Sequence, residues 1–229
     1  MKTQEKLYQD LAYLFENSHH HLYLVGGTVR DFLMRKNLDD MDAVTDATPE
    51  EMKDILKSYS VDYTFSKFGS VKLTYDNCKF DITTLRKETG YKDARHPGGV
   101  KFVKDLKVDV VRRDFTVNAM YLDKNFKLID FVHGAEDLNK GILRMVGNPS
   151  KRLREDPLRI VRAARFALTY NLTLDKKLKK AILANVSLIN KLNPQKVKQD
   201  LQKIKNVDRN EIEKLFSDLS IKHLLDMLD

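Results

Sequence analysis

The chain has 229 residues, of which 42% are hydrophobic and 32% are charged, so it can bury a core of its own. Its formal net charge of +8 favours a polyanionic partner, although a basic surface alone is compatible with membrane association or with no specific partner. No run of about 18 apolar residues occurs, and the charged amphipathic N-terminus is unlike a signal peptide, so we expect a cytoplasmic protein with no membrane partner. The single cysteine, Cys78, excludes an internal disulfide and a cysteine-rich metal site.

The first 60 residues alternate between helical and strand patterns. Apolar residues at helical spacing predict a helix over residues 4–17, and a short apolar run ending in glycine predicts a strand over 21–27. A helix over 28–36 and a strand over 39–46 follow. A helix over 48–59 begins with the cap residue Thr48, then Pro49, then Glu50 and Glu51 in its first turn.

The remaining chain divides into strands, a loop and helices. Residues 62–86 predict strands with a turn at Asp76 and Asn77, and the polar, glycine-rich stretch 87–102 predicts a mobile loop. From about Asp114 the pattern becomes helical, and beyond Glu155 almost wholly so. We therefore expect an α/β part up to about residue 145, followed by a helical part.

Two aspartates stand one residue apart in the predicted strand 39–46. Residues i and i+2 of a strand face the same way, so Asp40 and Asp42 project to one face while Met41 points into the core. Two carboxylates so close repel each other unless a cation or a proton intervenes. Mg²⁺ is commonly held by one or two carboxylates together with substrate phosphates. The pair therefore predicts a metal site completed by a nucleotide, against the alternative of a turn or surface role.

A glycine pair at the end of the preceding strand adds a candidate phosphate site. Gly26 and Gly27 let backbone N–H groups approach a phosphate closely, and the helix that follows presents its positive N-terminus. Arg30, one turn into that helix, is placed to reach the phosphates or the ribose. Each signal is weak alone, and their order and spacing together are much stronger.

Four motifs in order resemble a known family. "LVGGTVRD" followed by "DDMDAVTDA", then "VRRDFTVNAMYLD", "FVHGAEDLNKGILRMVG" and "RLREDPLRIVRAARFA", resemble the class II tRNA nucleotidyltransferase (CCA-adding enzyme) and bacterial poly(A) polymerase family. This family lies within the DNA polymerase β-like nucleotidyltransferases. The resemblance implies an α+β fold: a catalytic head domain over residues 1–145, with a small mixed β-sheet flanked by helices, and an all-helical neck-type domain for nucleotide recognition and RNA binding over 146–229.

The resemblance also implies an activity, which is template-independent addition of nucleotides to an RNA 3′ end. Asp40 and Asp42 would then hold two Mg²⁺ ions, one activating the terminal 3′-hydroxyl and one neutralising the triphosphate. The implied partners are the 3′ end of tRNA, CTP and ATP. We favour CCA addition, and keep A addition or poly(A) synthesis as the alternative, with a non-catalytic RNA-binding module as a third reading. The sequence leaves the oligomeric state open.

A polar stripe marks the motif near residue 160. On a helix, Asp156, Arg159, Arg162 and Arg165 lie on one polar face, and for a typical charged helix the favoured interpretation of such a face is a salt-bridged surface exposed to solvent. By resemblance, Asp156 and Arg159 read the Watson–Crick edge of the incoming base, because a carboxylate and an arginine fork supply its acceptor and donors. Arg162 and Arg165 would help to hold the nucleotide.

The "RRDFTVNA" motif carries three further residues by resemblance. Arg113 would meet the nucleotide phosphates, and Asp114 and Asn118, at helical i,i+4 spacing, would brace the site. The role of Arg112 is less defined.

Other polar residues have competing interpretations. Asp81 is a candidate third carboxylate, although a structural role is favoured, and Arg95 and His96 fall in the predicted loop. His133 is interpreted as a turn residue. Metal binding is not favoured for the run His19, His20 and His21, because adjacent residues alternate direction just before a strand.

The C-terminal part departs from the family pattern. tRNA-handling members continue with further helices, whereas this chain has only about sixty residues after Arg165, which predicts a shortened helical domain. The segment 193–204 resembles a helical motif that closes the family's catalytic core. Gln195 and Asp200 stand there at positions where glutamates are common, which leaves the role of this segment open.

Overall fold

The computed structural model describes residues 3–38, 40–93 and 96–228, and it divides into two compact units. The first unit comprises Met1–Thr89, Gly99–Arg113 and Val117–Ala135. The second comprises Gly90–Gly98, Asp114–Thr116 and Glu136–Asp229. The assignment of the two units as separate domains stays a prediction.

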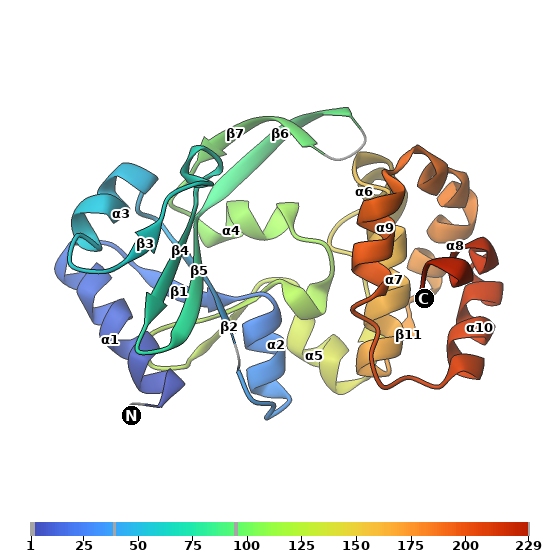
Figure 1. The fold of residues 1–229 in the computed structure, drawn as a ribbon, viewed down its shortest axis with the longest axis horizontal. Helices are drawn as coiled ribbons and strands as arrows, with labels where there is room; N and C mark the ends of the chain where they lie inside the picture. The colour runs from blue at the N-terminus through green and yellow to red at the C-terminus, as the bar shows by residue number, and fades with distance from the viewer. Residues whose placement is uncertain (1–2, 39, 94–95, 229) are drawn as a thin grey trace. The chain divides into compact units, whose positions relative to one another are not determined.

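The first unit is built on a mixed sheet of seven strands in the order β3-β4-β5-β2-β1-β8-β9 (Figure 1). β2 and β5 pair in parallel and every other neighbouring pair is antiparallel. The strands are β1 Leu22–Val25, β2 Asp40–Thr45, β3 Val61–Asp62, β4 Ser70–Tyr75, β5 Cys78–Thr84, β8 Met120–Leu122 and β9 Leu128–Asp130.

Three of the four α-helices described in the first unit begin at a residue whose side chain caps them, whereas the second begins at Gly26 without such a cap. The Thr48 side chain accepts a hydrogen bond from the Glu51 N–H while the Glu51 carboxylate accepts one from the Thr48 N–H, a reciprocal capping box that fixes the start of its helix. The first helix packs on β1, and the second contacts β1, β2 and β8. The helices are α1 Gln4–Asn17, α2 Gly27–Leu33, α3 Pro49–Ile55 and α4 Leu106–Asp109.

Two sequence predictions for this region are wrong. Residues 87–102, expected to be a mobile loop, lie largely in strands β6 Arg86–Asp93 and β7 His96–Phe102, which pair as a separate two-stranded sheet (Figure 1). The chain after Asp114, expected to become helical, instead adds β8 and β9 to the edge of the main sheet. Backbone hydrogen bonding between strands outweighs weak local propensity in both places.

The second unit is mainly helical. Its helices are α6 Pro149–Glu155, α7 Leu158–Tyr170, α8 Lys176–Asn185, α9 Pro194–Leu201 and α10 Arg209–Asp218, and α5 Gly134–Asn139 has residues in both units. β10 Ile142–Leu143 and β11 Thr173–Leu174 form a short parallel pair. α7 contacts α6, α9 and α10 and contributes more buried residues than any other helix described.

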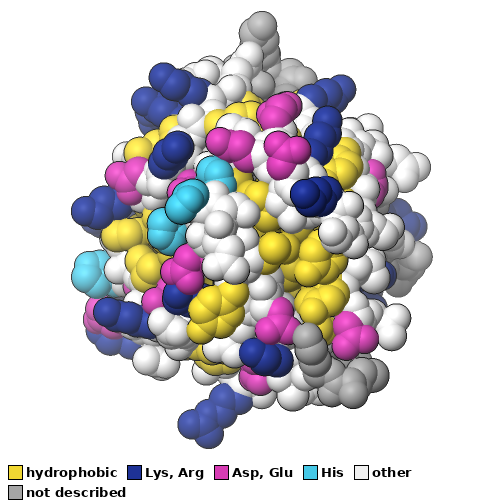
Figure 2. Space-filling view, turned by 90° about the vertical axis from the view of Figure 1, so that its left-hand side faces the viewer, with side chains coloured by type: hydrophobic (Ala, Val, Ile, Leu, Met, Phe, Trp, Pro, Cys, Tyr) yellow, Lys and Arg dark blue, Asp and Glu magenta, His cyan; other side chains and the backbone are white. Residues whose placement is uncertain are grey.

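Basic and acidic side chains are mixed on one face of the molecule. In Figure 2, lysine and arginine side chains are interspersed with acidic and apolar ones, so this face carries no single basic area. Within the residues described, none of the helices combines the length and the apolarity that crossing a membrane requires.

Candidate active site

The two predicted metal-ligating aspartates lie on one face of β2. Asp40 begins the strand and Asp42 follows two residues later, both with exposed side chains, while Met41 between them is fully buried. This is the alternation that the sequence predicts for a strand with one face on the core. The Asp42 backbone N–H donates to Thr28 Oγ1 at 2.8 Å, which ties the strand to α2.

A pocket of about 280 Å³ opens beside Asp42. It carries two carboxylates, Asp42 and Asp81, and three guanidinium groups, those of Arg86, Arg112 and Arg113. Its remaining lining comes from Val25, Gly26, Ala43, Val44, Ser70 and Thr83. Asp40 is not part of the lining. The pocket therefore combines a negative side suited to a cation with a positive side suited to an anion.

The carboxylates of the pocket resist ionisation. Burial raises the pKa of Asp42, and the negative charges of Asp81 and Asp40 raise it further, while Arg113 and Arg30 oppose them. Asp81 lies directly across the β2–β5 pair from Asp42, and its own pKa is also raised, first by burial. The Asp42 side chain still meets solvent in the pocket, and protein atoms on its other sides displace enough water to disfavour the charge.

This donor set fits a divalent cation. A metal ion near Asp42 would relieve the repulsion from Asp40 and Asp81 that raises its pKa. Among the described residues, no three Asp, Glu, His or Cys side chains converge as a complete metal site. The arrangement therefore suits an ion that takes its remaining ligands from water and a bound substrate.

The glycine pair lies against the same carboxylate. A Cβ added to Gly26 would stand 3.6 Å from Asp42 Oδ2 and 4.0 Å from Arg113 Nη1, and one on Gly27 would stand 3.4 Å from Arg30 Nη2. Gly26 also has φ +66°, a conformation that side-chain-bearing residues rarely adopt. Glycine therefore keeps the space beside Asp42 open, and binding of phosphate there stays a prediction.

Arg30 is buried and held by its own neighbours. Its guanidinium donates to Asn118 Oδ1 and, from Nε at 3.0 Å, to Asp31 Oδ1. Its charge lowers the pKa of Asp42. The predicted contact of Arg30 with phosphates or ribose stays untested, and what the structure adds is its electrostatic effect on Asp42.

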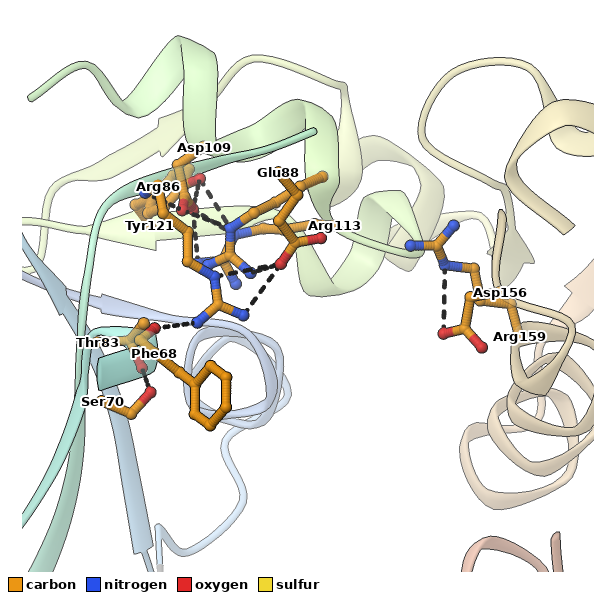
Figure 3. A network of polar contacts seen from close by, with 11 residues as sticks. Phe68, Ser70, Thr83, Arg86, Glu88, Asp109, Arg113, Tyr121, Asp156 and Arg159 are labelled. Carbon is orange, nitrogen blue, oxygen red and sulfur yellow. Dashed lines mark hydrogen bonds and ion pairs between the residues drawn. The ribbon is translucent and has the colours of Figure 1, made fainter. Parts of the chain in front are cut away.

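The arginines of the pocket belong to a polar network drawn in Figure 3. Arg113 donates to Asp109 Oδ2 and to the Tyr121 hydroxyl, at 2.8 Å from Nη2 and 3.2 Å from Nε respectively. Arg86 donates from Nη2 to Glu88 Oε1 at 3.0 Å. Sequence reasoning missed four of these residues: Arg86, Glu88, Asp109 and Tyr121. For Asp109 a signal existed, because it precedes Arg112 by three residues and Arg113 by four.

In the second unit, Asp156 of the predicted base-reading pair lies between α6 and α7, and Arg159 lies in the first turn of α7. Asp156 Oδ1 accepts the Leu158 N–H at 3.1 Å, and Arg159 Nε lies 4.0 Å from Asp156 Oδ2 (Figure 3). Arg159 is buried, and its Nη1 donates to the Arg152 carbonyl at 2.8 Å. Glu155 lies 3.6 Å from the same nitrogen. The guanidinium is thus held in one orientation, and base recognition by this pair stays a prediction.

The other two arginines of α7 are engaged within the second unit. Arg162 donates from Nε to Asp114 Oδ2 at 2.8 Å, and Arg165 donates from Nε to Asp200 Oδ2 at 3.0 Å. Arg159 and Arg165 are buried, so the alternative of a solvated charged face is wrong for them. The predicted contacts of Arg162 and Arg165 with nucleotide remain untested.

The expected helical pairing of Asp114 with Asn118 is wrong. Residues 116–118 form a 3₁₀ turn, and Asp114 precedes it without helical structure. Asp114 bonds Arg162 in the second unit, whereas Asn118 bonds Arg30 in the first. The local hydrogen bond from the Phe115 N–H to Asp114 Oδ1 competes with helix formation here.

The structure distinguishes among the residues that have competing interpretations in the sequence. Asp81 lines the pocket, whereas Arg95 and the His96 side chain lie outside the described residues. His133 adopts φ +60° in the turn before α5, as suits a turn residue. His20 Nδ1 lies 3.4 Å and His21 Nδ1 3.5 Å from Asp46 oxygens, which indicates pairing with a carboxylate.

Two curated relatives of the chain are both named CCA-adding enzyme. The CCA-adding enzyme of Lactobacillus helveticus is 40% identical over 182 residues, which are 80% of this chain and 45% of that protein. The CCA-adding enzyme of Staphylococcus epidermidis is 40% identical over 183 residues, with the same two coverages of 80% and 45%. The chain thus spans about half the length of the curated relatives that it matches.

Solved structures share the fold. The Bacillus stearothermophilus CCA-adding enzyme in complex with CTP superposes with a TM-score of 0.85 at 27% identity, over 96% of this chain and 53% of that one. A tRNA nucleotidyltransferase complexed with a primer tRNA and an incoming ATP analog gives a TM-score of 0.76 at 29% identity, over 96% and 62% of the two chains. The mixed α+β head fold is therefore that of these enzymes.

A family profile described as the poly(A) polymerase head domain matches residues 22–144, the segment that contains the glycine pair, both β2 aspartates and the arginine network. Because this match spans more than half of the sequence, the chain belongs to the poly(A) polymerase head-domain family.

Proposed function

We propose that the chain is the catalytic part of a cytoplasmic tRNA nucleotidyltransferase that adds C and A, from CTP and ATP, to the 3′ end of tRNA. The observation that carries this proposal is the pocket in which Asp42, with its raised pKa, faces Arg86, Arg112 and Arg113. The names of the relatives support the choice of tRNA, CTP and ATP as substrates. The curated relatives are CCA-adding enzymes, and the structural neighbours are described with CTP, a primer tRNA and an ATP analog.

In this proposal the first unit performs the chemistry. Asp40 and Asp42 would hold Mg²⁺, which when bound activates the 3′-hydroxyl and neutralises charge on the triphosphate. Gly26 leaves room for phosphate beside Asp42, and the arginines that line the same pocket bind phosphate oxygens. The 3′-hydroxyl attacks the α-phosphate, and diphosphate leaves.

In the same proposal, the second unit selects the base and binds RNA. Asp156 supplies acceptors and Arg159 supplies donors, which together match the edges of C and A. The buried position of Arg159 supports a fixed reading geometry, because little conformational entropy is left to lose on binding. Assignment of this part, residues 146–229, as a neck-type domain belongs to the same proposal.

The experiment is incubation of the purified chain with a tRNA transcript that ends before CCA, with each labelled NTP separately, with and without Mg²⁺. We expect Mg²⁺-dependent addition of C, and of A once C is present. An A added only to tRNA ending in CC would assign A addition, and long A tails on any RNA would assign poly(A) synthesis. Mg²⁺-independent incorporation, or none with any NTP, would contradict the proposal.

A further inference from the structure

Asp109, at the end of α4, is a fully buried carboxylate just behind the wall of the pocket. It is absent from the lining itself, yet both of its oxygens accept hydrogen bonds from groups that build the lining. Oδ1 accepts from Arg112 Nε at 2.8 Å and from the Arg86 backbone N–H at 3.2 Å. Oδ2 accepts from Arg113 and from the Tyr121 hydroxyl, the latter at 3.0 Å.

The geometry of Arg113 shows what this carboxylate does. Nε and Nη2 donate to Asp109 Oδ2 at 3.0 and 2.8 Å, and the guanidinium also lies over the Tyr121 ring with 5.2 Å to its centroid. These contacts fix one edge of the planar group. Its third nitrogen, Nη1, is thereby directed to the position beside Gly26, which also adjoins Asp42.

The charge of Asp109 persists at any working pH. Burial alone would raise the pKa of Asp109, but Arg113, Arg112 and the hydrogen bonds they and Arg86 donate lower it to about 2. A buried carboxylate that is this well paired keeps its partners oriented, because moving either arginine would leave the charge uncompensated.

We propose that Asp109 is a positioning residue that orients Arg112 and Arg113 on the wall of the pocket so that they bind the phosphates of a nucleoside triphosphate. This inference rests on the proposed function, since it concerns the same pocket. It assigns a role to a residue that touches no substrate. A residue needed only for folding would affect all ligands alike, whereas a positioning residue affects the phosphate part of the nucleotide selectively.

The test compares Asp109→Asn with the matched control Asp105→Asn. Asp105 is the exposed cap of the same helix, where it accepts the Lys107 N–H at 2.8 Å, away from the pocket lining. Equilibrium dissociation constants are measured by calorimetry for CTP, tripolyphosphate and cytidine in the presence of Mg²⁺. We expect Asp109→Asn to weaken CTP and tripolyphosphate binding by about tenfold or more, because charge-assisted bonds orient both guanidinium groups, and to leave cytidine unchanged. Asp105→Asn should leave all three dissociation constants within about twofold of the wild-type values.

Other outcomes separate this inference from the proposed function. Equal weakening of all three ligands, or unchanged tripolyphosphate binding, would overturn the positioning role. If Asp109→Asn does not fold, Asp109→Glu keeps the charge but displaces the guanidinium groups by one methylene, and unchanged tripolyphosphate affinity in that variant would overturn it too. A third outcome is that the wild-type chain binds tripolyphosphate, that Asp109→Asn weakens this binding, and that the wild-type chain adds no nucleotide to tRNA. That outcome would contradict only the proposed function. A wild-type chain that binds neither CTP nor tripolyphosphate would contradict both.

Discussion

Arg165 of α7 and Asp200 of α9 form a buried ion pair, in which Nε donates to Oδ2 at 3.0 Å. The resemblance described above predicts a glutamate at position 200, and the shorter Asp200 carboxylate still reaches Arg165, an arginine predicted to contact the nucleotide. The segment 193–204, whose role the sequence left open, therefore braces α7. Because α7 also carries Arg159, the pair stabilises the helix that is proposed to read the base.

From this pair we expect Arg165→Met to destabilise the chain by up to about 3–5 kcal/mol, because the buried Asp200 carboxylate then keeps only the distant, exposed Lys203 ammonium, 4.0 Å away, as an ion-pair partner among the described residues. Urea unfolding followed by circular dichroism measures the change. The double variant Arg165→Met with Asp200→Leu should recover most of the loss, since two apolar residues then fill the same site. If the losses of the two single variants simply add in the double variant, the two side chains are not coupled.

A second expectation concerns pH. The folded-state pKa of Asp42 is raised above its unfolded value, first by burial. At pH values between these two pKa values, the folded state therefore binds more protons than the unfolded state. Stability of the metal-free chain should then fall as pH rises above about 4, the ordinary range of an aspartate, through that raised pKa. Asp42→Asn should remove this component. Urea titrations in EDTA across the pH range test it, and parallel curves for the two proteins would contradict it.

Addition of Mg²⁺ gives the companion measurement. At neutral pH a bound cation relieves the repulsion among the carboxylates, so Mg²⁺ should raise the melting temperature of the wild type more than that of Asp42→Asn. This readout does not depend on activity. An equal shift in both proteins would mean that the ion binds elsewhere.

The third expectation concerns chemistry. Alanine at Asp42 should abolish nucleotide incorporation while RNA binding stays within about threefold, because contacts from lysine and arginine to phosphates supply most non-specific RNA affinity. Incorporation assays and filter binding measure the two quantities on the same preparation. Mg²⁺-dependent activity that survives alanine at both Asp40 and Asp42 would remove these residues from the catalytic role.

A fourth expectation concerns base choice. Arg159 is anchored by the Arg152 carbonyl, so Asp156→Ala should leave the arginine in place while it removes the carboxylate acceptor and the hydrogen bond that this carboxylate accepts from the Leu158 N–H. We expect the preference for C and A over U and G to narrow by about ten- to a hundredfold, the usual cost of an unmatched polar contact in a dry pocket. The measurement is kcat/KM for all four NTPs on tRNA ending before the first C and before the terminal A. A uniform fall in rate with unchanged ratios would make Asp156 a structural support.

The β6–β7 sheet leads to the last expectation. If it helps the site to change from C to A, a short glycine-serine linker in place of Gly90–Gly99 should spare C addition and impair the terminal A. This replacement leaves Arg86 and Glu88, which belong to the polar network, in place. Primer extension resolved to single nucleotides gives the measurement. Equal loss of both additions would show that the sheet supports catalysis in general.

Local signals in the sequence were enough to predict some of these features. The alternation Asp40-Met41-Asp42 predicts a strand with one buried residue, and the structure buries Met41 completely. Thr48 with Glu51 three residues later predicts a helix start, and both hydrogen bonds of the capping box are present. These features depend only on neighbours within a few residues, which the sequence displays directly.

Features set by distant partners could not be predicted. Asp114 and Asn118 have helical spacing, yet they bond arginines 48 and 88 residues away along the chain. β8 and β9 are strands because a sheet edge is available to them, which no local pattern records. Charged residues on α7 look solvent-exposed in the sequence, and only the tertiary fold reveals that Arg159 and Arg165 are buried.

The chain passes back and forth between the two units, at 89/90, 98/99, 113/114, 116/117 and 135/136. No single cut can therefore release either unit whole, because the segment 114–116 belongs with the helical residues while its covalent neighbours belong with the sheet. A fragment ending near residue 135 would lack Arg162, the partner of Asp114, and Arg144, whose carbonyl accepts the Thr116 N–H at 2.9 Å. Interleaved connectivity of this kind means that neither unit can be expressed whole as one continuous segment of the chain.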